Sequence, residues 1–204
     1  MAESNNQKVY PQVRIDKESF LFNNRILYLK GEIQSENSNI FDETTDIITS
    51  LFILDSISHS TITLYIDSAG GDVYTGLALY DVIRSLKSPV VTVGMGLVAS
   101  IAVIVFVAGE KRYVYPNSRI FIHEPWRWTS EREDASKLEV EACEIGVLKT
   151  RIQEILVERT GQKLERIKKD TDRNKYFSSL EAKKYGIVHE IIRVKNGKHG
   201  KNVK

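Results

Sequence analysis

The sequence predicts an α/β protein in which helices cover a largely parallel β-sheet. Segments with the alternating apolar spacing of strands and segments with helical spacing follow one another along most of the chain, separated by glycine-containing turns. Such an order is typical of right-handed βαβ crossovers. Strands are expected at residues 25–33, 61–67, 90–95, 112–115, 119–122 and 187–193, and helices at 40–54, 73–86, 98–108, 131–160, 163–169 and 179–185.

In the first half of the chain, each element follows from a local pattern. Residues 25–33 and 61–67 alternate as strands. Residues 40–54 gather their apolar side chains on one helical face, and Asp42 and Glu43 stand in the first turn, where negative charge suits the helix dipole. The sequence Ser68-Ala69-Gly70-Gly71 is expected to be the turn that opens the next helix.

In the second half, residues 90–95 are rich in β-branched side chains and an apolar run follows at 98–108, which predicts a buried strand and a buried helix. The pair Pro116-Asn117 predicts a turn between two short strands. Residues 131–160 carry apolar side chains at steps of three and four, so a long amphipathic helix is expected there.

Composition and charge limit the function classes. The chain has 204 residues, 42% hydrophobic and 27% charged, which is ordinary for one globular domain. A formal net charge of +2 gives no reason to expect nucleic acid or an anionic membrane surface as a partner. Cys143 is the single cysteine, and the first 20 residues lack the apolar core of a signal peptide. We therefore expect a cytoplasmic protein.

One segment raises the question of a membrane span. Residues 88–109 carry no charge and are long enough to cross a bilayer. However, Gly94 and Gly96 interrupt the segment between its β-branched part and the apolar run that follows. A buried strand followed by a buried helix fits this punctuation better, so no membrane segment is expected.

Three regions are expected along the chain. Residues 1–19 are polar and predict an N-terminal arm, residues 20–194 predict the folded domain, and residues 195–204 predict a solvated basic tail.

Ligands of parallel α/β sheets bind at the carboxyl ends of the strands, where turns start helices. The first such place here is residues 68–71, whose backbone N–H groups can hold an anion or an oxyanion, although Gly-Gly also serves as a plain tight connection. Because the chain has neither a G-x-G-x-x-G nor a P-loop motif, a bound nucleotide is not expected.

Two further places carry reactive side chains. Ser100 stands near the start of the expected helix 98–108, where it is either a nucleophile favoured by the helix dipole or a hydroxyl that bonds back to a carbonyl. His123 ends an apolar strand just before Pro125, where it is either a base or a buried, satisfied histidine. No set of His, Cys and carboxylate residues has the spacing of metal ligands, so neither a metal nor another cofactor is expected.

Four segments, taken together, resemble the proteolytic subunit of Clp protease, the ClpP family of serine peptidases. They are YIDSAGG (65–71), GMGLVAS (94–100), PNSRIFIHEP (116–125) and DTDRNKYFSSLEAKKYGIV (170–188), and the resemblance covers roughly residues 20–193. It implies a crotonase-like, ClpP-type βαβ superhelical core with a protruding handle at about 124–160. It also implies heptameric rings stacked as a tetradecamer, and an AAA+ Clp unfoldase ATPase that delivers unfolded polypeptides.

The same resemblance assigns roles to single residues. Ser100 matches the nucleophile and His123 the general base, while Gly70 and Ile101 match the residues whose backbone N–H groups form the oxyanion hole. The candidates for the substrate groove are Gly71, Pro125 and Trp126. A serine and a histidine in these roles would divide peptide hydrolysis into acylation and deacylation.

The chain departs from the family pattern at the acid of the triad. Where the family has an aspartate, the sequence has Asn174, which can orient an imidazole but cannot supply a negative charge to an imidazolium. Asp170 and Asp172 are possible substitutes. We therefore expect weak or conditional activity.

Other departures point in the same direction. Ala69 replaces the proline of the family's Ser-Pro-Gly-Gly, and Trp126 and Trp128 stand where the family usually has a strand with glycine that binds substrate. Of the surface aromatic residues that receive the unfoldase in the family, Tyr65, Tyr113 and Tyr115 match, whereas Thr63 and Ser85 do not.

The expected function is that of a serine endopeptidase subunit of an ATP-dependent Clp protease, assembled with a more active paralogous subunit. Two alternatives remain open. The chain could be an idle structural or regulatory subunit of a mixed ring, or an acyl-CoA hydratase-like enzyme on the related crotonase architecture.

Overall fold

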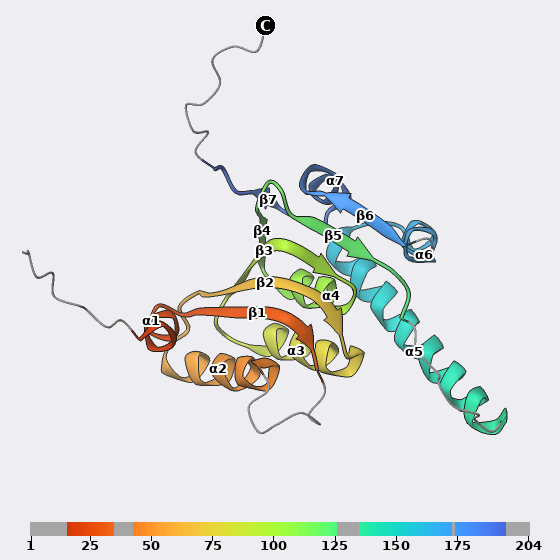
Figure 1. Ribbon diagram of the computed structural model, residues 1–204, viewed down its shortest axis with the longest axis horizontal. Helices are drawn as coiled ribbons and strands as arrows, with labels where there is room; N and C mark the ends of the chain where they lie inside the picture. The colour runs from red at the N-terminus through yellow and green to blue at the C-terminus, as the bar shows by residue number, and fades with distance from the viewer. Residues whose placement is uncertain (1–15, 35–42, 126–134, 173, 195–204) are drawn as a thin grey trace, which may run out of the picture.

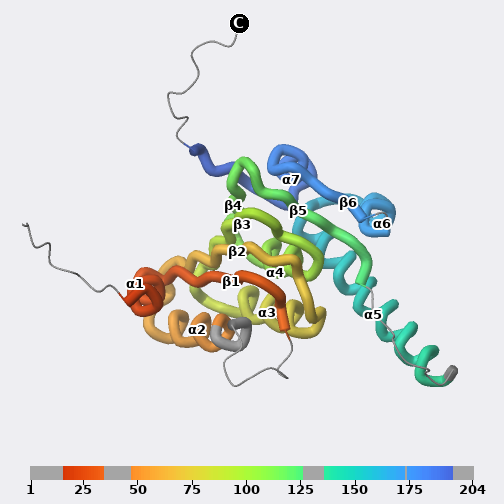
Figure 2. Tube along the Cα trace, in the orientation of Figure 1, coloured from red at the N-terminus to blue at the C-terminus, as the bar shows by residue number. Residues whose placement is uncertain are grey.

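The computed structural model describes residues 16–34, 43–125, 135–172 and 174–194 (Figures 1 and 2). Within these residues the strands are β1 Ile26–Ile33, β2 Ile62–Gly71, β3 Val90–Ala99, β4 Lys111–Val114, β5 Arg119–Ile122, β6 Lys175–Ser178 and β7 Glu190–Ile191. The helices are α1 Lys17–Asn23, α2 Glu43–Ile57, α3 Val73–Ser85, α4 Ile101–Ala108, α5 Ala135–Thr160, α6 Leu164–Asp172 and α7 Ser179–Tyr185.

The sheet is parallel along the order β1-β2-β3-β4-β7, as the alternation of strands and helices predicts. Strand β3 has a different neighbour at its C-terminal end, where its last residues pair in parallel with β5. Strand β5 then pairs with β6 in the one antiparallel contact among the described strands. The sheet therefore branches at β3, and the branch carries β5 and β6 away from β4.

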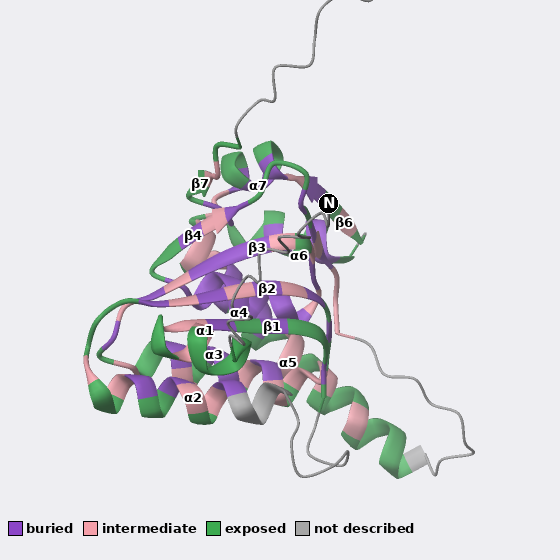
Figure 3. Ribbon diagram, turned by 60° about the vertical axis from the view of Figure 1, so that its left-hand side comes forward, coloured by how far each residue is buried: buried purple, intermediate pink, exposed green. Residues whose placement is uncertain are grey.

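The core lies between the sheet and the helices beneath it (Figures 1 and 3). Helix α4 is buried along its whole length and packs against β2, β3, α3 and α5. The approach of α3 is close, since a methyl group at Gly76 would lie 2.3 Å from Cγ1 of Ile101. Helix α5 packs on α4 only through its C-terminal half, which buries Ile152, Ile155 and Leu156, and its other half extends away from the core.

Several boundaries differ from the predicted ones. Strand β2 continues through residues 68–71, which were expected to form a turn, because this stretch pairs with the end of β1. Strand β3 continues through Gly94 and Gly96, so α4 begins at Ile101 and not at residue 98. Strand β6 was not predicted, and β7 is shorter than the expected strand 187–193.

The regions expected at the chain ends stay predictions, because most of their residues lie outside the described part of the chain. Helix α1 begins at Lys17, inside the stretch 1–19 that was expected to be an arm, and it buries no side chain. Residues 1–15 of that arm, the tail 195–204, and residues 131–134 of the expected long helix lie outside the described residues. The segment 88–109 divides into β3 and α4, as expected. Among the described helices, none combines the length and the apolar character that a bilayer span requires.

Two arginines, Arg112 of β4 and Arg159 of α5, link these elements to their neighbours by bonding to backbone carbonyls. Nη1 of the buried Arg112 donates to the carbonyl of Arg159 at 2.8 Å, and Nε of Arg159 donates to the carbonyl of Val107 at 2.8 Å. Burial lowers the pKa of Arg112 to about 10. The backbone N–H of Arg112 donates to Nδ1 of His189 at 3.2 Å. Partial burial, followed by the charge of Arg112, lowers the pKa of His189 as well.

This histidine predicts a pH dependence of stability. In the unfolded chain His189 takes up a proton as the pH falls through about 6.5, whereas the folded chain resists protonation until a lower pH. The free energy of unfolding is therefore fully present above that range and falls as the pH drops below it. Urea unfolding at about pH 7.5 and about pH 5.5 should show a larger loss for the wild type than for His189→Gln. An equal loss in both proteins would contradict this origin.

Candidate active site

The site is built at the point where β3 changes its partner. Residues 91–94 of β3 pair with β4, and residues 97–99 pair with β5. Ser100 follows immediately, between the last residue of β3 and the first residue of α4. Its backbone N–H donates to the carbonyl of Phe121 in β5 at 2.9 Å. The branch of the sheet thus carries Ser100 to the end of the strand that leads to His123.

The backbone of Ser100 has an unusual conformation, with φ 57° and ψ −131°. For a residue with a side chain this region is sparsely populated and costs about 1–3 kcal/mol. The serine side chain does not cap α4, and its hydroxyl makes no hydrogen bond within the part of the chain that the structure describes. Among the described residues, this hydroxyl therefore does not bond back to a carbonyl, which was the alternative considered for it.

Gly70 packs directly against Ser100. A methyl group at Gly70, which has φ +97°, would lie 2.6 Å from Cβ of Ser100 and 2.9 Å from the carbonyl oxygen of Ala99. Only glycine fits this approach. However, the N–H of Gly70 donates to Oγ of Ser68 at 3.1 Å, so this N–H is already engaged.

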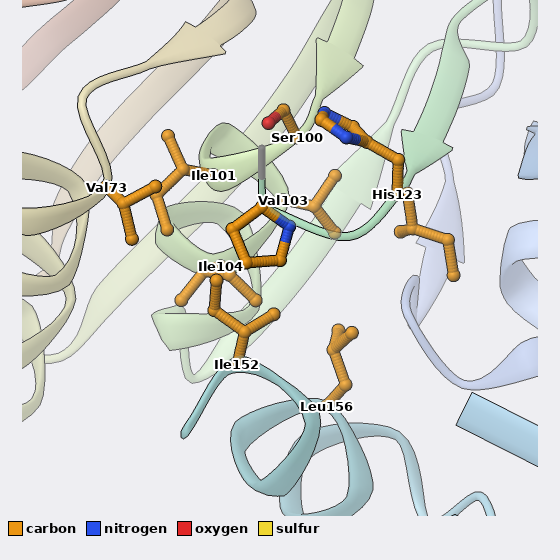
Figure 4. A pocket seen from close by; sticks show the side chains of 10 residues that line it. Val73, Ser100, Ile101, Val103, Ile104, His123, Ile152 and Leu156 are labelled. Carbon is orange, nitrogen blue, oxygen red and sulfur yellow. The ribbon is translucent and has the colours of Figure 1, made fainter. Parts of the chain in front are cut away.

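His123 follows β5 and is half-buried. Its ring stacks on Phe121 with centroids 5.2 Å apart, and Phe121 stacks in turn on Tyr176 of β6 at 4.2 Å. Ser100 and His123 line the same pocket, as Figure 4 shows, although no hydrogen bond joins the two side chains in the described part of the chain. Catalytic hydrogen bonds are often long in an empty site, so this separation is compatible with a Ser–His pair.

The strand that was not predicted positions Asn174. Strands β5 and β6 are antiparallel, with Ile122 opposite Lys175 in the last recorded pair. His123 directly follows β5 and Asn174 directly precedes β6, so the two residues lie at the same end of this strand pair. Asn174 has a left-handed backbone with φ 54°, a conformation that asparagine tolerates better than most residues.

The two nearby aspartates, Asp170 and Asp172, have surroundings of their own. Asp170 is buried and accepts from Nζ of Lys175 at 2.7 Å. Its pKa is lowered, because hydrogen bonds and charges from Lys175 and its other neighbours outweigh the opposing effect of burial. Asp172 is exposed and lines a polar cleft with Glu124 and Lys149, and the lining of this cleft shares no residue with that of the pocket beside Ser100.

The pocket beside Ser100 is small and mainly apolar. Its volume is about 20 Å³, enough for little more than one water molecule. Helix α5 contributes Ile152 and Leu156 to its lining, and α4 contributes Ile101, Val103 and Ile104 (Figure 4). Val73 and Pro125 also line a larger groove of about 520 Å³, which Gly71 and the exposed half of α5 border. Two of the three groove candidates therefore meet in one groove, while Trp126 lies outside the described residues.

Sequence reasoning missed one polar residue of this region, Asp67. Its carboxylate accepts from the backbone N–H of Leu97 at 3.0 Å, inside the bend of β3. The only sequence signal was an acidic residue directly after an apolar strand, next to the glycine-rich stretch.

The conformation of Ser100 can be tested by two variants that both lack the hydroxyl. We expect Ser100→Gly to be more stable than Ser100→Ala by about 1 kcal/mol, because glycine adopts this backbone conformation without strain, which outweighs its usual entropic cost. Urea unfolding of the two variants under the same conditions measures the difference. If the glycine variant is instead the less stable of the two, Ser100 is not strained.

Three comparisons identify the family. The family model for Clp protease matches residues 11–195. The chain is 42% identical over 171 residues to ATP-dependent Clp protease proteolytic subunit 2 of Prochlorococcus marinus (strain MIT 9312), covering 82% of this chain and 81% of the relative. It is also 42% identical over 171 residues to proteolytic subunit 3 of Synechococcus sp. (strain CC9605), covering 82% of each.

A solved structure gives the same result for the fold. An Asn-to-Asp mutant of ClpP1 from Listeria monocytogenes superposes with a TM-score of 0.75 at 39% identity, covering 87% of this chain and 96% of that one. The expected ClpP-type α/β fold is thereby confirmed. On these matches, the chain belongs to the Clp protease family, as a proteolytic subunit of the serine peptidase type.

Proposed function

We propose that this subunit is an endopeptidase that uses Ser100 as nucleophile and His123 as general base, with an activity limited by Asn174. The observation that carries the proposal is the shared pocket of Ser100 and His123 at the ends of two paired strands. A free hydroxyl, an adjacent imidazole and a groove that leads to both are the parts that acyl transfer requires.

The proposed reaction has two steps. In acylation, Oγ of Ser100 attacks the peptide carbonyl carbon while His123 takes the hydroxyl proton, and the same proton then passes to the leaving amine as the C–N bond breaks. In deacylation, a water molecule attacks the ester, again with His123 as base, and Ser100 recovers its proton. Asn174 acts only through His123, whose ring it would orient by accepting an N–H.

The oxyanion that forms in both steps needs backbone donors. The N–H of Ile101 belongs to the first turn of α4 and has no intrahelical acceptor, which suits this role. Gly70 can serve only after its N–H leaves Oγ of Ser68. Gly71 is a second candidate, because it follows Gly70 directly and borders the groove beside the pocket of Ser100.

The absent carboxylate is the basis for low activity. In a protease with a Ser-His-Asp triad, the change from aspartate to asparagine lowers kcat by about 10⁴. A neutral amide provides no charge to stabilise the imidazolium that forms when Ser100 loses its proton. Asp170 is committed to Lys175, so it does not replace the missing charge.

The exposed surfaces support assembly. The protruding half of α5 exposes Leu138, Val140 and Val147, which fits a handle, within about residues 124–160, through which heptameric rings stack as a tetradecamer. Tyr28 and Tyr65 stack at 5.0 Å on the face of the sheet and lie near Tyr115, which fits a surface for an AAA+ unfoldase that delivers unfolded polypeptides. A paralogous subunit with a complete triad would supply the stronger activity of a mixed ring.

An idle structural subunit is the competing function. It is favoured by the absence of a hydrogen bond between Ser100 and His123 among the described residues, and by the engaged N–H of Gly70. The two functions differ in what a serine-directed fluorophosphonate does to the purified protein. An adduct seen by intact mass in the wild type but not in Ser100→Ala supports the peptidase, whereas no adduct, alone or with a paralogue present, supports the structural subunit.

The role of Asn174 predicts a gain of function. We expect Asn174→Asp to raise the rate of peptide hydrolysis at least tenfold, towards the limit of about 10⁴, because a carboxylate stabilises the imidazolium. Fluorogenic peptide hydrolysis by the assembled variant measures the gain, with Asn174→Asp/Ser100→Ala as the control for contaminating proteases. No gain in any assembly state would contradict the explanation through the missing charge.

A further inference from the structure

We infer that Asp67 is a positioning residue for the nucleophile: its carboxylate holds the bend of β3 that carries Ser100 into the site. This inference rests on the proposed function of Ser100. It concerns a side chain that does not touch the reacting atoms and acts through the backbone of residues 95–99.

The first observation is a mismatch between β2 and β3. Ile66 pairs with Gly94 and Ser68 pairs with Val98, so two steps along β2 correspond to four along β3. Three residues of β3, numbers 95–97, therefore stand opposite Asp67 alone. A bulge of this kind removes backbone groups from the ladder, and they need other partners.

The second observation is how one of those groups is satisfied. The N–H of Leu97 donates to Oδ1 of Asp67 at 3.0 Å. The side chain of Asp67 thus takes the place of the missing partner in β2 at the last residue of the bulge.

The third observation is the close fit around the carboxylate. Gly96 has φ +51°, and a methyl group there would lie 2.6 Å from Oδ1 of Asp67. The carboxylate therefore lies directly against the backbone of the bulge. Without it the bulge would lose both this hydrogen bond and the group packed against Gly96, and we expect residues 97–99 to be held less firmly beside β5.

Position matters here because Ser100 lies only three residues beyond Leu97. A displacement of about 1 Å at a reacting group can lower a rate about hundredfold. Removal of the Asp67 carboxylate should therefore lower the reactivity of Ser100 and not merely the overall stability.

The test compares Asp67→Ala with Asp67→Asn in the full assembled protein. Asparagine keeps an oxygen that can accept from the N–H of Leu97, so the rate constant for fluorophosphonate labelling of Asp67→Asn should stay within about threefold of the wild-type value. The rate constant for Asp67→Ala should be lower by about tenfold to hundredfold. Asp55→Ala is the matched control, because Asp55 also accepts a backbone N–H, that of Ser88 at 2.7 Å, but does so outside the site. The control should lose stability and keep its labelling rate.

Hydrogen–deuterium exchange of the peptide spanning residues 95–101 provides a readout that does not need activity. Exchange there should rise in Asp67→Ala and stay at the wild-type level in Asp67→Asn. If the wild type is not labelled at all, the proposed function fails, and exchange alone still decides the role of Asp67. The inference is overturned if folded Asp67→Ala has the same labelling rate and the same exchange as the wild type. It is also overturned if Asp55→Ala is labelled as slowly as Asp67→Ala.

Discussion

The site depends on one constraint in the sheet: β3 must pair with two strands that diverge from each other. Its first half pairs with β4 and its second half with β5, and the change falls at the bulge between Gly94 and Val98. A straight β3 would continue beside β4 and would not pair with β5. Because β3 bends, the end of the strand meets β5, and Ser100 reaches the neighbourhood of His123. Gly94 and Gly96 matter for this bend, because a side chain at either position would meet a close neighbour and because Gly96 has a positive φ.

Local patterns in the sequence predicted the order of strands and helices well, because alternation and helical spacing persist wherever an element buries one face. They failed where pairing between distant segments decides the structure. Residues 68–71 look like a turn, yet they extend β2 because Ile33 of β1 lies alongside. Strand β6 has only four residues, Lys175–Ser178, too few for a clear alternation, and its partner β5 lies more than fifty residues earlier.

The position of Asn174 shows how motif and geometry complement each other. By resemblance, the motif gives Asn174 the position of the triad acid, and in the structure His123 directly follows β5 while Asn174 directly precedes its partner β6. The resemblance gives the acid position to Asn174, but the sequence leaves Asp170 and Asp172 open as substitutes, since all three lie within a few residues. The structure separates them, because Asp170 is buried with Lys175 while Asn174 stands at the end of the strand.

The strain at Ser100 is maintained by the surrounding elements and not by its own side chain. Its N–H is fixed by the carbonyl of Phe121, its carbonyl accepts from the N–H of Val103, and Gly70 packs against its Cβ. Helix α4, which follows, is buried on every side and cannot shift to relieve the backbone. Since none of these contacts uses the hydroxyl, the group stays available for chemistry. A serine held in place by its own hydrogen bond would have to break that bond before it could react.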